Sequence, residues 1–67
     1  MENISKRIKE LRKENNLSAK QLAKKIGVSD ATIIRWENAK MSPKAEYIVL
    51  LCDFFNVSAD YILGRID

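Results

Sequence analysis

Apolar residues recur at helical spacing from the start of the chain. Ile4, Ile8 and Leu11 lie on one face of a 3.6-residue repeat, and the nearby lysines fall mostly elsewhere. This pattern predicts an amphipathic helix over about residues 3–15. One proline and two glycines are too few for a hairpin-rich β protein, and no Asn-Gly or Asp-Gly turn is present. The pattern therefore predicts an all-α chain.

A second helix is marked at both ends by its capping residues. Ser18 and Gln21 have the spacing of a capping box, in which two side chains satisfy free backbone N–H groups. An apolar stripe then runs to Ile26, and Gly27 supplies the positive φ that stops a helix. We therefore predict a helix over about residues 18–26, followed by a tight turn.

A third helix follows after only about two residues. Ser29 has the side chain of an N-cap, which predicts a helix over about residues 29–38. Ile33 and Trp36 lie on one side of that helix. The opposite side groups residues that the core does not need, namely Asp30, Ala31, Ile34 and Arg35.

Two more helix starts complete the chain. Ser42 precedes Pro43, which predicts a fourth helix with proline at its first position, where a missing N–H costs nothing. That helix is expected to run to about Phe55. Ser58 then caps a short fifth helix, and Gly64 ends it. We predict one compact five-helix domain over the whole chain, residues 1–67.

The fourth helix is apolar nearly all round, since eight of the nine residues 47–55 are apolar. We expect other parts of the protein, or a second subunit, to cover a helix of this kind. One stripe faces the core and consists of Ile48, Leu51, Cys52 and Phe55. The rest, which predict a homodimer contact, are Val49, Leu50 and Phe54. The alternative is that the first and fifth helices bury them within one subunit.

Charge is divided unevenly along the chain. Residues 1–44 hold eleven Lys and Arg against five Asp and Glu, whereas residues 45–67 hold one against four. Clustered cations that neutralise phosphates would explain the split, and so would an uneven solvated surface. Charge alone does not separate the two interpretations.

Several classes of protein are excluded by what the chain lacks. With 67 residues it has no room for a second, catalytic domain. There is no histidine, Gly-rich phosphate loop or Gly-x-Ser-x-Gly, and the single cysteine, Cys52, has the spacing of a core residue. We therefore expect no enzyme activity, metal, cofactor or small-molecule ligand. No apolar run is long enough for a membrane span or a signal peptide, so we expect a cytoplasmic protein.

Two helices joined by a tight glycine-containing turn match the helix-turn-helix description. The chain resembles the lambda-repressor/Cro-like family in the segments LSAKQLA (17–23), IGVS (26–29), TI (32–33), RWEN (35–38), SP (42–43), FNVS (55–58) and DYIL (60–63). The resemblance implies a five-helix regulator of transcription, of repressor type, that binds palindromic double-stranded operator DNA as a two-fold dimer. It also implies that the third helix enters the major groove.

Matching positions supply the expected DNA contacts. Base contacts are expected from Asp30, Ala31, Ile34 and Arg35. Phosphate contacts are expected from Ser18, Ala19, Ser29, Thr32, Asn38, Lys40 and Lys44, with backbone N–H groups and ammonium groups both contributing in the loop after the third helix.

Three of the base-contact positions have alternative roles. Arg35 can donate two hydrogen bonds to guanine, or else bind phosphate or a nearby acid. Ile34 can meet a thymine methyl or be a stray surface residue. Asp30 can accept a hydrogen bond from cytosine or stabilise the N-terminus of the helix, and we favour the second role.

The chain departs from the family pattern at two positions and keeps a structural pair. The family has glutamine at the position of Ala19 and glycine at that of Ala39, so a phosphate ligand and a tight loop are in question. Arg12 and Glu37 match an ion pair that ties the first helix to the end of the third; neither residue is catalytic. The alternative is two separate surface charges.

A different class of function uses the same scaffold. A helix-turn-helix domain can serve as a protein-interaction module, for example as an antitoxin whose main partner is another protein. Salt separates the two functions, because phosphate binding depends steeply on salt and apolar contacts do not.

Overall fold

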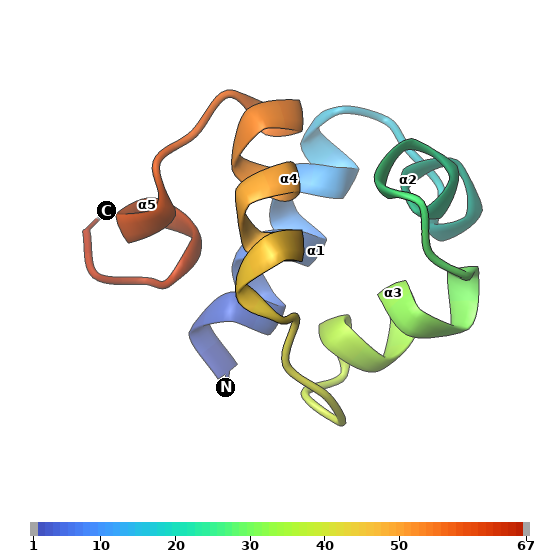
Figure 1. Cartoon of the computed structure of the whole chain (residues 1–67), viewed down its shortest axis with the longest axis horizontal. Helices are drawn as coiled ribbons and strands as arrows, with labels where there is room; N and C mark the ends of the chain where they lie inside the picture. The colour runs from blue at the N-terminus through green and yellow to red at the C-terminus, as the bar shows by residue number, and fades with distance from the viewer. Residues whose placement is uncertain (1, 67) are drawn as a thin grey trace.

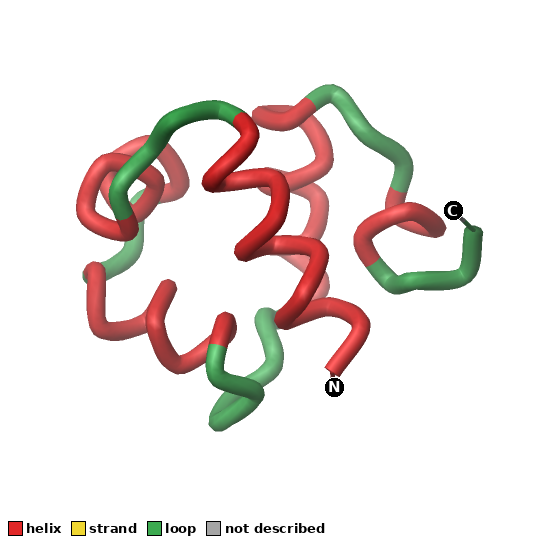
Figure 2. Tube along the Cα trace, turned by 180° about the vertical axis from the view of Figure 1, so that it is seen from behind, coloured by secondary structure: helices red, strands yellow, loops and turns green. Residues whose placement is uncertain are grey.

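Five helices make up the computed structural model, which describes residues 2–66 and contains no strand among them. In chain order they are α1 (Glu2–Glu14), α2 (Ala19–Ile26), α3 (Asp30–Glu37), α4 (Ala45–Phe55) and α5 (Ala59–Ile62). Helices α1 and α4 occupy the middle of the molecule, with α2 and α3 on one side and α5 on the other (Figure 1). Figure 2 shows from behind that short loops join them. The predicted all-α, five-helix fold is confirmed.

The helix-turn-helix unit forms where the capping residues predicted it. The Ser18 hydroxyl accepts from the Gln21 N–H at 3.0 Å, and the Gln21 side-chain oxygen accepts from the Ser18 N–H at 2.8 Å. Gly27 ends α2 with φ +90°. The Ser29 hydroxyl accepts from the Thr32 N–H at 3.2 Å and starts α3. Local hydrogen bonds therefore fix both ends of the turn.

Helix α4 begins later than its sequence signal predicted. Its first hydrogen-bonded carbonyl belongs to Lys44, which accepts from the N–H groups of Tyr47 and Ile48. Lys44 is the N-cap, with φ −68° and ψ 160°, and its side chain makes no capping hydrogen bond. Pro43 is buried in the loop before the helix. The prediction of Ser42 as N-cap and Pro43 as first helical residue is therefore wrong, because Pro43 packs inward and the chain stays extended through Lys44.

Every helix contributes to a single core. The buried apolar side chains are Ile4, Ile8, Leu11, Leu22, Ala23, Ile26, Ile33, Trp36, Leu51 and Ile62. The Trp36 and Tyr47 rings pack with their centroids 5.7 Å apart, which joins α3 to α4. Only Leu51 of α4 is fully buried; its neighbours on the predicted core stripe are half-buried. This packing fixes the side of α3 that points inward.

Three further features concern membrane-spanning helices, metal ligands and the single cysteine. None of the helices within residues 2–66 has the length and apolar character needed to cross a membrane. In the same part of the chain, no three His, Cys, Asp or Glu side chains gather where they could hold a metal ion. Burial, and then the charge of Asp53, raises the pKa of the Cys52 thiol, so this thiol stays protonated at neutral pH.

Candidate nucleic-acid interface

Helix α3 has one buried side and one exposed side. Ile33 and Trp36 are 0% and 1% exposed, because they pack against the core. The four residues of the opposite side are all exposed, namely Asp30, Ala31, Ile34 and Arg35. Ile34 retains 47% of its accessible surface. The predicted division of this helix is confirmed, and the packing of the core leaves its outer side to solvent.

Arg35 and Asp30 differ in how far the protein already engages them. The side chain of Arg35 forms no ion pair or hydrogen bond with any residue from 2 to 66, so the donors of its exposed guanidinium are available to an outside partner. Asp30 accepts from the Ala31 N–H at 2.9 Å and lies in the first turn of α3. That contact supports the helix-end role of Asp30, where a carboxylate faces the positive end of the helix.

Two hydroxyl groups at the start of α3 share one hydrogen bond. The Oγ of Ser29 and the Oγ1 of Thr32 are 2.9 Å apart, and either can be the donor. Whichever hydroxyl donates, the other keeps its proton for an outside acceptor. The pair can therefore give one hydrogen bond to a phosphate without breaking the cap of α3.

The start of α2 offers a second donor group. The Ser18 hydroxyl accepts from Gln21 and keeps its own O–H free to donate. Ala19 is the first residue of the helix, where backbone N–H groups have no partner within the helix. Ala19 has no side chain that can bind phosphate, unlike the glutamine of the family pattern. The donors available at the start of α2 are therefore the first-turn N–H groups and the Ser18 hydroxyl.

The loop after α3 keeps a tight turn although it lacks glycine. Ala39 has φ +59°, in the left-handed region where a Cβ is unfavourable. The N–H groups of Asn38, Ala39 and Lys40 donate to the carbonyls of Ile34, Trp36 and Arg35 respectively. The expectation that backbone N–H groups of Asn38 and Lys40 would bind phosphate is therefore corrected, because these groups already cap α3. Only the exposed side chains of Asn38 and Lys40 remain available to bind phosphate.

Arg12 and Glu37 form the expected ion pair. The Nε of Arg12 donates to one Glu37 carboxylate oxygen at 2.6 Å, and Nη2 donates to the other at 2.9 Å. A third donor, Nη1, binds the carbonyl of Leu17 at 2.9 Å. The two side chains are 15% and 6% exposed, and the hydrogen bond to Glu37 raises the pKa of Arg12. The pair joins α1 to the end of α3 and fixes where the turn before α2 lies.

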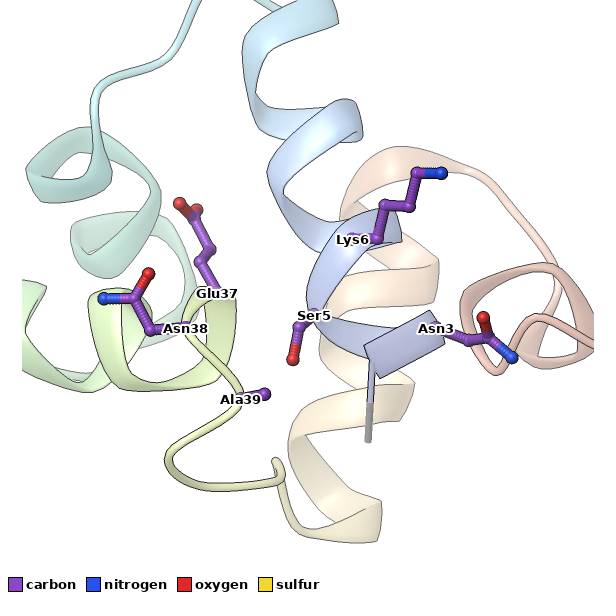
Figure 3. A pocket seen from close by; sticks show the side chains of 6 residues that line it. All are labelled: Asn3, Ser5, Lys6, Glu37, Asn38 and Ala39. Atoms are coloured by element: carbon purple, nitrogen blue, oxygen red, sulfur yellow. The ribbon is translucent and has the colours of Figure 1, made fainter.

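A depression of about 460 Å³ lies between the start of α1 and the end of α3 (Figure 3). It brings Lys6, which the sequence analysis did not select, beside Asn38 and Ala39. In Figure 3 Ser5 points toward the loop after α3, whereas Lys6 and Glu37 point away from the space between them. No sequence signal links Lys6 to that loop, because packing of α1 on α3 alone brings them together.

A separate apolar surface lies on α4. Val49, Leu50 and Phe54 are 58%, 44% and 40% exposed. The alternative that α1 and α5 bury these three residues within one subunit is therefore excluded. We call these three residues the α4 patch.

Similarity to known proteins agrees with this geometry. The helix-turn-helix family matches residues 8–62. The chain is 38% identical over 61 residues to YobD of Bacillus subtilis, an uncharacterised HTH-type transcriptional regulator, covering 91% of this chain and 54% of YobD. It is 39% identical over 62 residues to the antitoxin PezA of Streptococcus pneumoniae, covering 92% of this chain and 39% of PezA. The chain thus spans about half or less of the length of these two relatives.

Solved structures are similar as well. The P22 c2 repressor in complex with synthetic operator 9T superposes with a TM-score of 0.83 at 30% identity, covering 88% of this chain and 89% of the repressor chain. By sequence and by structure, this chain belongs to the helix-turn-helix family.

Proposed function

We propose that this chain is a sequence-specific double-stranded DNA-binding regulator of transcription, of repressor type, that reads the major groove with α3. The observation that carries the proposal is the outer side of α3, which is exposed and makes no packing contribution. A helix held this way can enter a groove while its buried side stays on the core. The operator complex of the similar P22 c2 repressor supports the same assignment.

Base reading is assigned to the exposed side of α3. Arg35 supplies a bidentate donor that fits guanine O6 and N7, and its lack of an internal partner supports this role. Ile34 and Ala31 supply apolar contacts of the kind that a thymine methyl accepts. Asp30 acts mainly on the N-terminus of α3.

Phosphate binding is assigned to the residues that flank α3. The hydroxyls of Ser18, Ser29 and Thr32 and the first-turn N–H groups of Ala19 act as neutral donors. The side chains of Asn38, Lys40 and Lys44 contribute an amide and two ammonium groups. This distribution gives affinity from charge and sequence preference from α3.

The proposal is tested by separating these two kinds of contact. Operator sites are first selected from random duplexes, and affinities are then measured on selected and scrambled DNA across a salt series. Arg35→Ala should cost about 1–3 kcal/mol on the selected site and relax one base in each half-site. Lys44→Ala should weaken both duplexes alike and lower the salt slope by about one.

A matched control removes a cation far from α3. Arg65 lies three residues after the end of α5, and α5 is on the side of the molecule opposite α2 and α3 (Figure 1), so Arg65→Ala should leave both affinities unchanged. Equal losses on selected and scrambled DNA for Arg35→Ala would make Arg35 a phosphate ligand and move sequence reading to Ala31, Ile34 or Asp30. Absence of salt-dependent binding to any duplex would remove the proposed function.

The DNA-binding unit is proposed to be a homodimer joined through the α4 patch. Its three residues are exposed and apolar on a helix that gives the core only one fully buried side chain, so pairing two copies removes this surface from water. Leu50→Glu with Phe54→Glu should give a folded monomer in analytical ultracentrifugation, with unchanged helix content by circular dichroism. A parent protein that is monomeric at high concentration, with and without operator, would refute the dimer.

The second candidate function is protein binding, as in an antitoxin. Similarity to the antitoxin PezA and the α4 patch favour it. This function predicts binding to a partner protein that persists at high salt and is abolished by the Leu50→Glu and Phe54→Glu changes but not by Arg35→Ala.

A further inference from the structure

A groove of about 390 Å³ lies between α3 and the start of α4. Its floor is apolar and is formed by Val28, Trp36, Met41 and Tyr47. The rings of Trp36 and Tyr47 are tilted by 47° to each other. Trp36 is only 1% exposed, so its ring lies just beneath the floor and the Tyr47 ring supplies most of the aromatic surface. Met41 is 45% exposed and adds a flexible, adaptable side chain to this floor. Small-molecule sites have this size and this mainly apolar, aromatic lining.

One rim of the groove is polar and positive. Thr32 and Lys44 line it, and the Lys44 ammonium has no ion pair or hydrogen bond with any residue from 2 to 66. Lys44 is also the N-cap of α4, so the positive end of that helix dipole adds to its charge. None of the described residues that line the groove carries a carboxylate. The charge of the rim therefore complements an anion, and the floor complements an apolar ring.

We propose that this groove binds a small amphiphilic monoanion, a carboxylate carried on an alicyclic or aromatic ring. The ring lies on the apolar floor and the carboxylate meets Lys44 and the Thr32 hydroxyl. Because the proposed function uses Thr32 and Lys44 as phosphate ligands, a bound carboxylate excludes the DNA backbone and releases the operator. That release rests on the proposed function, whereas binding of the carboxylate does not.

Trp36 allows binding to be followed without any label, because it is the only tryptophan of the chain and lies in the floor. The probe is cyclohexanecarboxylate, and the neutral control is cyclohexanecarboxamide, which has nearly the same shape. Each is titrated at constant ionic strength while indole fluorescence and the indole N–H NMR signal of Trp36 are recorded. A ligand of this size in an open groove is expected to bind with a Kd of about 1–10 mM.

Two lysine variants test the anion preference. Lys44→Met keeps an unbranched apolar side chain and removes the charge, so carboxylate binding should weaken about two- to five-fold, the range of an exposed ion pair. Lys13→Met is the matched control, because Lys13 is an exposed lysine of α1 that does not line the groove and has no part in the proposed DNA interface; this variant should bind the carboxylate as tightly as the parent does. The carboxamide should bind the parent about two- to five-fold more weakly than the carboxylate.

The outcomes separate this proposal from the proposed function. A Trp36 signal that does not move with carboxylate, or that moves only with duplex DNA, overturns the site and leaves the groove to the DNA backbone. Equal binding of carboxylate and carboxamide overturns the anion assignment. Carboxylate binding together with loss of operator binding supports the whole proposal. Carboxylate binding to a chain that binds no DNA supports the site while refuting the proposed function.

Discussion

The Arg12–Glu37 pair offers the sharpest test of how the fold is held together. Arg12→Ala removes the three hydrogen bonds that the guanidinium donates and leaves Glu37, whose side chain is 6% exposed, without its cation. Stranding one member of a buried pair costs about 3–5 kcal/mol, and we expect the lower end of this range because the Arg12–Glu37 pair is part-buried. A domain of 67 residues has about 3–10 kcal/mol of stability in total, so this variant should be largely unfolded or melt far lower.

A milder variant keeps the measurement informative if Arg12→Ala does not fold. Glu37→Gln preserves the shape and one acceptor while removing the charge, and we expect a loss of about 1–3 kcal/mol. Replacing both members by methionine should cost far less than Arg12→Ala, because no charge is then stranded. The matched control is Arg65→Ala, which breaks an exposed contact to Asp60 at 3.8 Å and should change stability by less than about 0.5 kcal/mol.

Urea unfolding at equilibrium, followed by Trp36 fluorescence and by circular dichroism, gives each free energy of unfolding. The raised pKa of Arg12 means that the contribution of its charge is fully present below the ordinary arginine pKa and is lost only as pH rises through the higher folded value. Across neutral and mildly alkaline pH the arginine side of the pair therefore introduces no pH dependence. If Arg12→Ala unfolds at the same urea concentration as Arg65→Ala, then Arg12 and Glu37 behave as two separate surface charges, and the predicted stabilisation by their ion pair is wrong.

Two further substitutions test local conformation. Ala39→Gly should raise the free energy of unfolding by about 0.5–1 kcal/mol, because it removes a Cβ at φ +59°. Asn56→Gly, at φ +56°, is the control and should change the free energy of unfolding little, because asparagine tolerates this region. Urea unfolding measures both. Lys44→Ser should supply the missing cap of α4 and raise stability by about 0.5–1 kcal/mol, while lowering DNA affinity and the salt slope as Lys44→Ala does. A loss of stability in Lys44→Ser, or unchanged DNA affinity, would contradict the second expectation.

The parts of the fold that depend on neighbours in sequence could be predicted from the sequence. Ser18, Gln21, Gly27 and Ser29 act over three residues or fewer, and the structure realises each predicted role. The split of α3 into buried and exposed sides followed from helical periodicity for the same reason. Local hydrogen bonds and periodicity are therefore sufficient to place the helix-turn-helix unit.

The parts that depend on tertiary packing could not be predicted from local pattern. Ser42 and Pro43 form a helix-start signal, yet Pro43 packs inward and delays the start of α4. The Arg12–Glu37 pair spans 25 residues and was expected only from the family resemblance, since spacing alone does not join two such distant charges. The groove beside Trp36 brings Val28 and Lys44 together across two loops, which no local rule describes.

Residues that are unfavourable for the stability of the isolated domain lie on the two surfaces that we assign to DNA or ligand binding and to protein contacts. Lysine is a poor N-cap, because it has no acceptor and adds charge to the positive end of a helix, yet Lys44 holds this position in α4. The exposed Leu50 and Phe54 likewise give a single subunit little stability. Neither feature serves the core, which is complete without them. Local conflict of this kind is expected where a residue acts on something outside the chain, a phosphate or carboxylate for Lys44 and a second protein surface for the α4 patch.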